Sequence, residues 1–170
     1  EEAMKDYDKA IELNPQFAAA YNNRGSAKAE LGRNEEAMKD CDKAIELNPQ
    51  YAAAYNNRGI AKAKLGRHEE AMKDFDKAVE LDPQFAEAYY NRGFAKAKLG
   101  RNEEAMKDYD KAIELNPQYV KAYYNRGEAK EKLGRNEEAM KDFDKAIELD
   151  PQLAVAYNNR EKSKAHRGRN

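Results

Sequence analysis

The stretch YNNRG at residues 21–25 returns as YNNRG at 55–59, YYNRG at 89–93, YYNRG at 123–127 and YNNRE at 157–161. Each copy begins 34 residues after the one before it, and the 170 residues hold five such units without remainder. A fixed period of this length is typical of stacked repeat arrays, in which each unit buries its apolar face only against its neighbours. We therefore expect a repeat architecture in place of a single central core.

Each unit is predicted to form two helices. In the first complete unit, one helix covers 17–31 (FAAAYNNRGSAKAEL), and Gly32 supplies the left-handed residue that ends it. Asn34 is predicted to cap a second helix at 35–47, which stops at the Asn48-Pro49 step. No stretch favours a strand, so the predicted fold class is all-α. The helix pairs are expected at about 17–47, 51–81, 85–115 and 119–149, with a lone second-type helix at 1–13 and a lone first-type helix at 153–167.

Composition narrows the class of protein. The chain has 31 Lys and Arg against 32 Asp and Glu, no apolar run long enough to cross a membrane and no signal-peptide leader. Its one cysteine, Cys41, stands where the other units have Tyr or Phe; we interpret it as a small core residue, with a reactive thiol as the alternative. An intrachain disulfide is impossible, which favours a reducing compartment and a cytoplasmic location. Because residue 1 is not methionine, we expect a fragment, a processed product or a designed chain.

These residues resemble the tetratricopeptide repeat over the whole chain. The family pattern has an aromatic residue, a glycine, two small residues and a proline at fixed places, and here Tyr21, Gly25, Ala37, Ala44 and Pro49 take them. Two positions depart in every unit, with arginine where leucine is usual and lysine where tyrosine is usual. The resemblance implies a right-handed α-solenoid whose glycine and first alanine lie where the helices of a unit cross. The structural residues are then Tyr21, Tyr55, Tyr89 and Tyr123, Gly25, Gly59, Gly93 and Gly127, Ala37, Ala71, Ala105 and Ala139, and Pro15, Pro49, Pro83, Pro117 and Pro151.

Variation between the units collects on one stripe of the first helix. At 100° per residue, the varying positions fall opposite the nearly constant ones, and the resemblance implies that this stripe lines a concave groove that binds peptides. The candidate groove residues are Asn22, Asn56, Tyr90 and Tyr124, Ile60 and Phe94, and Lys64, Lys98, Lys121 and Lys132.

A second, invariant asparagine borders the stripe at Asn23, Asn57, Asn91, Asn125 and Asn159. Amides at regular spacing can hold an extended peptide backbone through paired donor and acceptor bonds. The equally weighted alternative is that they bond only to neighbouring helices or to water. The family's clamp for chaperone tails is not expected, because only Lys121 matches it and Asn125 stands where that clamp has arginine.

Charge argues against nucleic acid as the partner. Arg24 and Lys28 lie on the core-leaning side, where we expect them to form ion pairs with carboxylates of the second helices in preference to an anion site. The stripe itself is close to neutral, at about +1, because Lys64, Lys98, Lys121, Lys132 and Lys162 face Glu30, Glu87, Glu128 and Glu131. A nucleic-acid interface would need a clustered basic excess.

No grouping of residues in the sequence indicates catalysis. His68 and His166 are isolated, no Cys or His grouping has metal-ligand spacing, and the glycines do not form a phosphate loop. No cofactor or metal is expected. Two function classes remain: a non-catalytic scaffold that binds an extended peptide or a partner helix, and a structural, designed or duplicated array without a dedicated ligand.

The two ends of the chain are expected to differ. Glu161 and Ser163 replace the glycine and an alanine of the other units, as in a capping helix. Ala3, Tyr7, Ala10 and Ile11 instead repeat the core stripe, so that face should be exposed and allow weak association through residues 1–13. Glu161 hinders head-to-tail stacking, which favours a symmetric pairing of the N-terminal helices.

Overall fold

The computed structural model describes residues 2–167, with side chains from Met4 onward. These residues form ten helices and no strand, which confirms the all-α prediction. The helices are α1 (Glu2–Leu13), α2 (Ala18–Glu30), α3 (Asn34–Leu47), α4 (Ala52–Lys64), α5 (His68–Leu81), α6 (Ala86–Lys98), α7 (Asn102–Leu115), α8 (Val120–Lys132), α9 (Asn136–Leu149) and α10 (Ala154–Arg167). The even-numbered helices carry the YNNRG-type stretches and are the first helices of their repeats; the odd-numbered ones are the second helices.

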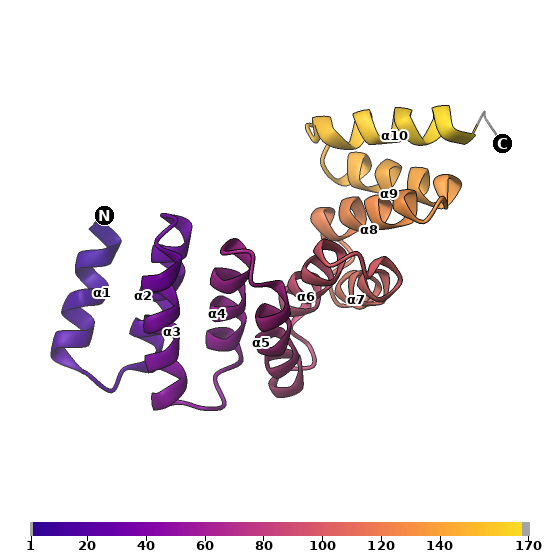
Figure 1. The fold of residues 1–170 in the computed structure, drawn as a ribbon. Coiled ribbons are helices and arrows are strands. Elements are labelled where there is room, and N and C mark those ends of the chain that lie inside the picture. Colours follow the sequence, from indigo (N-terminus) through magenta and orange to yellow (C-terminus); the bar gives the residue numbers. More distant parts are fainter. Residues whose placement is uncertain (1, 168–170) are drawn as a thin grey trace. The chain divides into compact units, whose positions relative to one another are not determined.

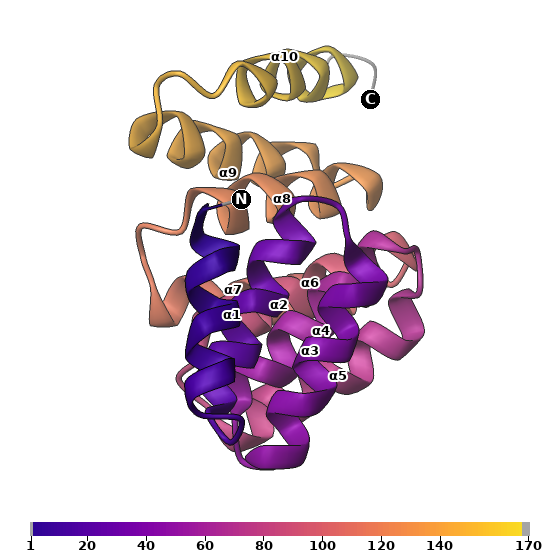
Figure 2. The same cartoon turned by 90° about the vertical axis from the view of Figure 1, so that its left-hand side faces the viewer.

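The chain divides into two compact units, which we call unit 1 (residues 1–84, α1–α5) and unit 2 (residues 85–170, α6–α10). Within each unit every helix packs against the next one along the chain (Figure 1). The first helices of successive repeats also touch, α2 with α4 in unit 1 and α8 with both α6 and α10 in unit 2. Figure 2 shows α9 between α8 and α10 in unit 2. The side of the first helices that faces away from the second helices is the first-helix face.

Glycine and proline set the helix boundaries. Gly32, which follows α2, has φ of 77°, the left-handed conformation that ends a helix at low cost only for glycine. Asn48, before Pro49, is extended at φ −141° and ψ 92°, as the residue before proline prefers. The predicted stop signals are therefore the ones that the structure uses.

The predicted cap at Asn34 is wrong. Helix α3 already includes Asn34, and the Arg33 carbonyl accepts the first intrahelical bond, from Ala37 N at 2.9 Å. A residue inside the first turn no longer directs its side chain at the free N–H groups, and no side-chain cap bond forms. Asn34 Oδ1 is buried without a hydrogen-bond partner among the described residues, as are Asn102 Oδ1 and Asn136 Oδ1.

Glycine at the centre of the first helix allows close packing on the second. A Cβ atom on Gly59 would lie 2.6 Å from Phe75 Cε1, and one on Gly127 would lie 2.7 Å from Phe143 Cε1. Both rings are fully buried. The backbone penalty of glycine in a helix, about 1 kcal/mol, is thus offset by burial of an aromatic ring. The predicted helix crossing at the glycine is confirmed.

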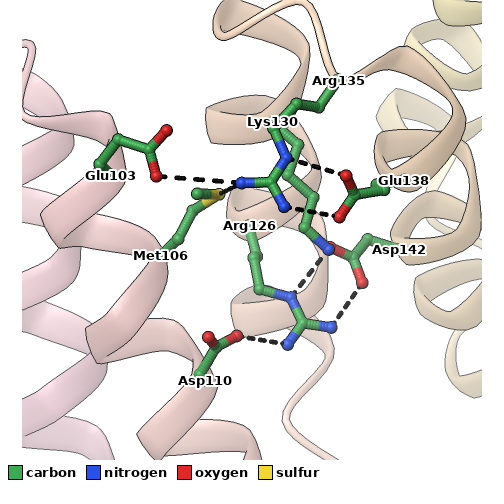
Figure 3. A network of polar contacts seen from close by, with 8 residues as sticks. All are labelled: Glu103, Met106, Asp110, Arg126, Lys130, Arg135, Glu138 and Asp142. Carbon is green, nitrogen blue, oxygen red and sulfur yellow. Dashed lines mark hydrogen bonds and ion pairs between the residues drawn. The ribbon is translucent and has the colours of Figure 1, made fainter.

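The arginine of each YNNRG stretch links the layers of first and second helices. Arg126 donates from Nε and Nη2 to Asp142 at 2.9 and 2.6 Å and from Nη1 to Asp110 at 2.7 Å (Figure 3). Lys130 Nζ lies 2.7 Å from the same Asp142 carboxylate, whose side chain is 6% exposed. A buried carboxylate that holds two cations ties α8 to α9, while Asp110 ties it to α7.

The same network repeats in unit 1. Arg58 binds Asp74 with two bonds and Asp42 with one, and Lys62 joins Asp74 at 2.7 Å. The hydrogen bonds to Asp74 raise the pKa of the Arg58 guanidinium above its ordinary value. Arg24 makes the corresponding bonds to Asp40 and Asp8. The predicted ion pairs between layers are confirmed, and they account for the arginine and lysine that depart from the family pattern.

The first and last helices, α1 and α10, differ in the polarity of their side chains, as in the sequence. On α1, Tyr7, Ala10 and Ile11 are half-buried against α2. The counterparts of Tyr7 and Ala10 in the inner repeats are buried, whereas those of Ile11 are half-buried as well; the Ala3 side chain lies outside the described residues. The α1 stripe is therefore less exposed than predicted. On α10, Glu161 is exposed and its carboxylate lies 2.7 Å from Lys164 Nζ.

Candidate functional site

Asparagines bridge the two first helices of unit 1. Asn57 Nδ2 donates to Asn22 Oδ1 at 2.9 Å, and Asn22 Nδ2 reaches Tyr51 Oη at 3.5 Å. Asn22 is 4% exposed. Farther along the pair, Lys64 Nζ donates to the Ala29 carbonyl oxygen at 2.7 Å, at the C-terminal end of α2. Polar side chains on this part of the first-helix face are therefore engaged between helices.

Tyrosines take the corresponding places in unit 2. Asn125 Nδ2 donates to Tyr90 Oη at 2.7 Å, and Asn159 Nδ2 donates to Tyr124 Oη at 2.9 Å. The Tyr90 ring stacks on Tyr119 with centroids 5.0 Å apart. Replacing an asparagine by a tyrosine keeps the inter-helix hydrogen bond while lining the face with aromatic rings.

Burial keeps these phenols protonated. It raises the pKa of Tyr90 to about 12. It also raises the pKa of Tyr124 to about 12, with a further contribution from the Glu128 carboxylate nearby. Both hydroxyls thus stay protonated well above neutral pH, and Tyr124 Oη donates to Glu128 Oε1 at 3.0 Å.

Hollows open on the first-helix face of unit 2. One of about 490 Å³ lies between α6 and the start of α8 and is lined by Glu87, Tyr90, Asn91, Asn116, Gln118, Tyr119, Val120 and Lys121. A second, of about 390 Å³, lies between α8 and α10 and is lined by Tyr124, Glu128, Glu131, Lys132, Val155, Asn158, Asn159, Lys162 and His166. A narrow polar one of about 40 Å³ is lined by Phe94, Ala97, Lys98, Asn102, Tyr109, Asn125, Glu128, Ala129 and Lys132. The first two are of the size that side chains of a bound peptide fill.

The predicted groove residues separate by unit. Those of unit 2 line the three hollows: Tyr90, Asn91, Phe94, Lys98, Lys121, Tyr124, Asn125, Lys132 and Asn159. In unit 1, Asn22 and Asn56 are buried, Asn57 and Ile60 are half-buried, and Asn23 and Lys64 are exposed. Sequence reasoning counted Glu128 and Glu131 among the charges of the stripe but named neither them nor Tyr119 and Val120 as candidate binding residues. Helix α8 carried the signal, because VKAYYNRGEAKEK departs from the other first helices at several of these positions.

A different pair of hollows lies where a second helix meets the following first helix, one between α9 and α10 and one between α7, α8 and the start of α9. One of about 500 Å³ is lined by Glu137, Met140, Lys141, Asp144, Arg160, Lys164 and Arg167, and one of about 300 Å³ by Glu103, Met106, Lys107, Asp110, Lys130, Arg135 and Glu138. Most of these residues correspond after a shift of 34 positions. In the smaller hollow Arg135 pairs with Glu138 and reaches Met106 (Figure 3). These hollows follow from the repeat itself, whereas those on the first-helix face depend on residues particular to unit 2.

Cys41 is fully buried, and burial, together with the Asp40 carboxylate, raises the pKa of its thiol to about 12. Nucleophilic chemistry needs the thiolate, so this environment favours the interpretation as a core residue. Among the described residues no group of three His, Cys, Asp or Glu side chains is placed to hold a metal ion. None of the described helices is long and apolar enough to cross a membrane.

Comparisons with known proteins agree with this architecture. The model described as TPR repeat matches residues 1–32, 25–66, 61–100 and 97–134, and the model described as Tetratricopeptide repeat matches residues 120–153. The chain belongs to the tetratricopeptide repeat family. Proteins of this family generally act as non-catalytic scaffolds for protein interactions. None of the curated proteins compared with the chain matches it.

Solved tetratricopeptide repeat structures share the fold over most of the chain. YrrB, described as having an unusual peptide-binding site, is 28% identical with a TM-score of 0.78 over 95% of this chain and 84% of its own. MamA is 27% identical with a TM-score of 0.76 over 89% of each chain. The first TPR of Spaghetti (RPAP3), bound to the HSP90 peptide SRMEEVD, is 28% identical with a TM-score of 0.68 over 70% of this chain and 94% of its own.

Proposed function

We propose that this chain is a non-catalytic scaffold that binds an extended peptide segment of a partner protein on the first-helix face of unit 2. The observation that carries the proposal is the hollow of about 490 Å³ beside Tyr90. Tyr90, Tyr119 and Val120 give it an apolar wall, while amides and charged groups surround them. An apolar pocket with a few placed polar groups is the usual form of a binding site. Two similar structures carry peptide-binding sites in their descriptions, which supports the same role here.

The asparagines would contribute their oxygen atoms to the peptide. Asn57, Asn125 and Asn159 already donate their Nδ2 groups to the preceding first helix. A peptide backbone N–H could still bond to a side-chain oxygen, which has two lone pairs. Because these amides are already bonded between helices, we infer that they contribute less to peptide affinity than free amides would. The tyrosine rings would supply most of the contact with the peptide.

Binding should depend only modestly on salt. The first-helix stripe is close to neutral, so long-range attraction by one sign of charge is weak. A nucleic-acid partner would instead need a concentrated basic surface and would show a steep salt dependence. The partner is therefore inferred to be a protein segment, whose identity would be set by its side chains.

A library of random peptides displayed on phage tests the proposal. Peptides selected on the 170-residue chain would be synthesised and measured by fluorescence anisotropy against wild type, Tyr90→Asn and Tyr157→Asn. Tyr90→Asn installs the residue of unit 1 and should weaken binding about ten-fold, as expected for a central aromatic anchor. Tyr157→Asn makes the same change at an exposed position outside the hollows and should leave affinity unchanged. Failure to select any peptide, or equal losses in both variants, would contradict the proposal.

The second candidate is an array that associates with itself, and the half-buried Tyr7 on α1 favours it. Head-to-tail stacking on α10 is disfavoured because Glu161 carries side-chain atoms where Gly59 or Gly127 leaves space for a ring. Sedimentation at increasing concentration separates the two candidates. Weak association lost on Tyr7→Ser would support it, and a monomer at all concentrations would exclude it.

A further inference from the structure

Two residues of α8 depart from the repeat at positions that face one hollow. Glu128 stands where the other units have Ser26, Ile60, Phe94 and Lys162, and Glu131 stands where they have alanine. Both line the hollow of about 390 Å³ between α8 and α10. Within a chain whose units are otherwise nearly identical, two carboxylates introduced on one wall give this hollow a chemistry that the other repeats lack.

The Glu128 carboxylate is oriented before any ligand arrives. Its Oε1 accepts from Tyr124 Oη at 3.0 Å and from Asn159 Nδ2 at 3.3 Å. Asn159 Nδ2 also donates to Tyr124 Oη at 2.9 Å, so the three side chains form one network. The Tyr124 ring packs against Phe143 with centroids 5.8 Å apart, which fixes the network to the core. Both bonds end on Oε1, which leaves Oε2 free to accept.

These carboxylates lack a cationic partner in the described chain. Three glutamates are half-buried there: Glu138 pairs with Arg135, whereas Glu128 and Glu131 form no ion pair. Lys132 and Lys162 line the same hollow, but both are exposed and neither pairs with a carboxylate in it. The buried aspartates between the helix layers each hold an arginine and a lysine, so Glu128 and Glu131 differ from them in having no cation beside the carboxylate.

We propose that this hollow is a subsite for one basic side chain, lysine or arginine, of the peptide that the scaffold binds; the inference rests on the proposed function. The ammonium or guanidinium group would bond to Glu128 Oε2 and pair with Glu131. The aliphatic stem of the side chain would lie against Val155 and the Tyr124 ring, as long basic side chains do on apolar surface. A charged acceptor strengthens such hydrogen bonds relative to neutral ones.

Helix spacing predicts where the basic residue falls in the peptide. The hollow beside Tyr90 lies between α6 and α8, and the glutamate hollow lies between α8 and α10. Packed helices are roughly 8–10 Å apart, and an extended chain advances about 3.3 Å per residue. Along α8 the two hollows are also offset by about eight residues, from Val120 to Glu128, or roughly 12 Å at 1.5 Å per residue. The basic residue is therefore expected about four or five positions from the apolar residue that occupies the hollow beside Tyr90.

The experiment selects peptides from the same random phage library on three proteins. They are wild type, Glu128→Gln/Glu131→Gln and the charge-matched control Glu30→Gln/Glu161→Gln, whose glutamates are exposed and lie outside the hollow. Lysine or arginine should be enriched at one position on wild type and on the control, and the enrichment should vanish on Glu128→Gln/Glu131→Gln. Enrichment that persists on that variant, or selected peptides without a preferred basic residue, would overturn the subsite while leaving the proposed function standing. Selection of no peptide on wild type would overturn both.

A selected peptide then gives the size of the effect. Replacing its basic residue by methionine should weaken binding to wild type about ten-fold, measured by anisotropy, and should change binding to Glu128→Gln/Glu131→Gln little. Equal losses on both proteins would show that the residue is recognised elsewhere. If the double variant does not fold, Glu131→Ala restores the residue found in the other units and should lose part of the same preference; an unchanged preference would count against the subsite.

Discussion

Units 1 and 2 share the glycine crossings and the arginine–aspartate layers but differ on the first-helix face. In unit 1, Asn57 bonds to a buried Asn22, and Lys64 bonds to the end of the neighbouring helix. In unit 2, Tyr90 takes the place of Asn22, accepts the corresponding bond from Asn125 and lines the hollow of about 490 Å³. The contrast shows that the contacts between first and second helices form a scaffold common to both units. Single residues on the first-helix face decide whether the bridge between neighbouring first helices is made by an asparagine or by a tyrosine whose ring lines a hollow.

The largest effect is expected where the common scaffold is most tightly packed. Gly59→Leu in unit 1 places side-chain atoms where even a Cβ lies 2.6 Å from the buried Phe75 ring, so we expect destabilisation of about 3 kcal/mol through overpacking. Gly127→Leu in unit 2, facing Phe143, should be equally severe. Denaturant unfolding measures both, and Glu161→Leu is the control because its side chain is already accommodated in α10. A loss in Glu161→Leu as large as in Gly59→Leu would refute the packing role assigned to the glycines.

The ion pairs between the first and second helices offer a second test of what the two units share. Asp74→Asn in unit 1 and Asp142→Asn in unit 2 each remove a buried charge that holds an arginine and a lysine. Breaking a buried pair by removing one partner is strongly destabilising, and since these cations keep some contact with water we expect about 2–3 kcal/mol for each variant. Unfolding free energies should be similar in the two. A large difference between them would mean that the network is not common to both units.

Much of this common scaffold was predictable because it repeats. Five copies reveal the glycine, the arginine and the turn residues, and the φ of Gly32 and the bonds of Arg24 bear out their predicted roles. The cap at Asn34 failed because one residue of displacement moves a side chain from the helix end into the first turn. Periodicity also could not distinguish a buried asparagine from an exposed one at the edge of the stripe. The distinction at Asn22 depends on which side chain the next repeat presents.

The two asparagines that face Asn22 and Tyr90 should differ when removed. Asn57→Ala leaves the oxygen of a buried amide without its donor, so we expect a loss of about 2 kcal/mol. Asn125→Ala removes a bond to the Tyr90 hydroxyl. Asn125 itself lines a polar hollow that water can enter, so a smaller loss of about 1 kcal/mol is expected. Thermal or denaturant unfolding of each variant gives the comparison. Losses in the reverse order would mean that unit 2, and not unit 1, has the more tightly closed first-helix face.

The smallest effect near neutral pH concerns Cys41 of unit 1, whose place in unit 2 is taken by the buried Tyr109. Burial raises the pKa of the thiol from 9.0 to about 12, and because the neutral form is favoured in the fold, its contribution to stability is complete below pH 9 and is lost as the pH rises toward 12. At about pH 8, a thiol reagent should therefore leave the folded chain unlabelled and react at once in denaturant. Cys41→Ala provides the matched control for stability: between pH 9 and 12 it should lose less unfolding free energy than wild type. Rapid labelling of the native chain would show that the contact between α2 and α3 opens readily around the cysteine, and that unit 1 is the looser of the two units in its core.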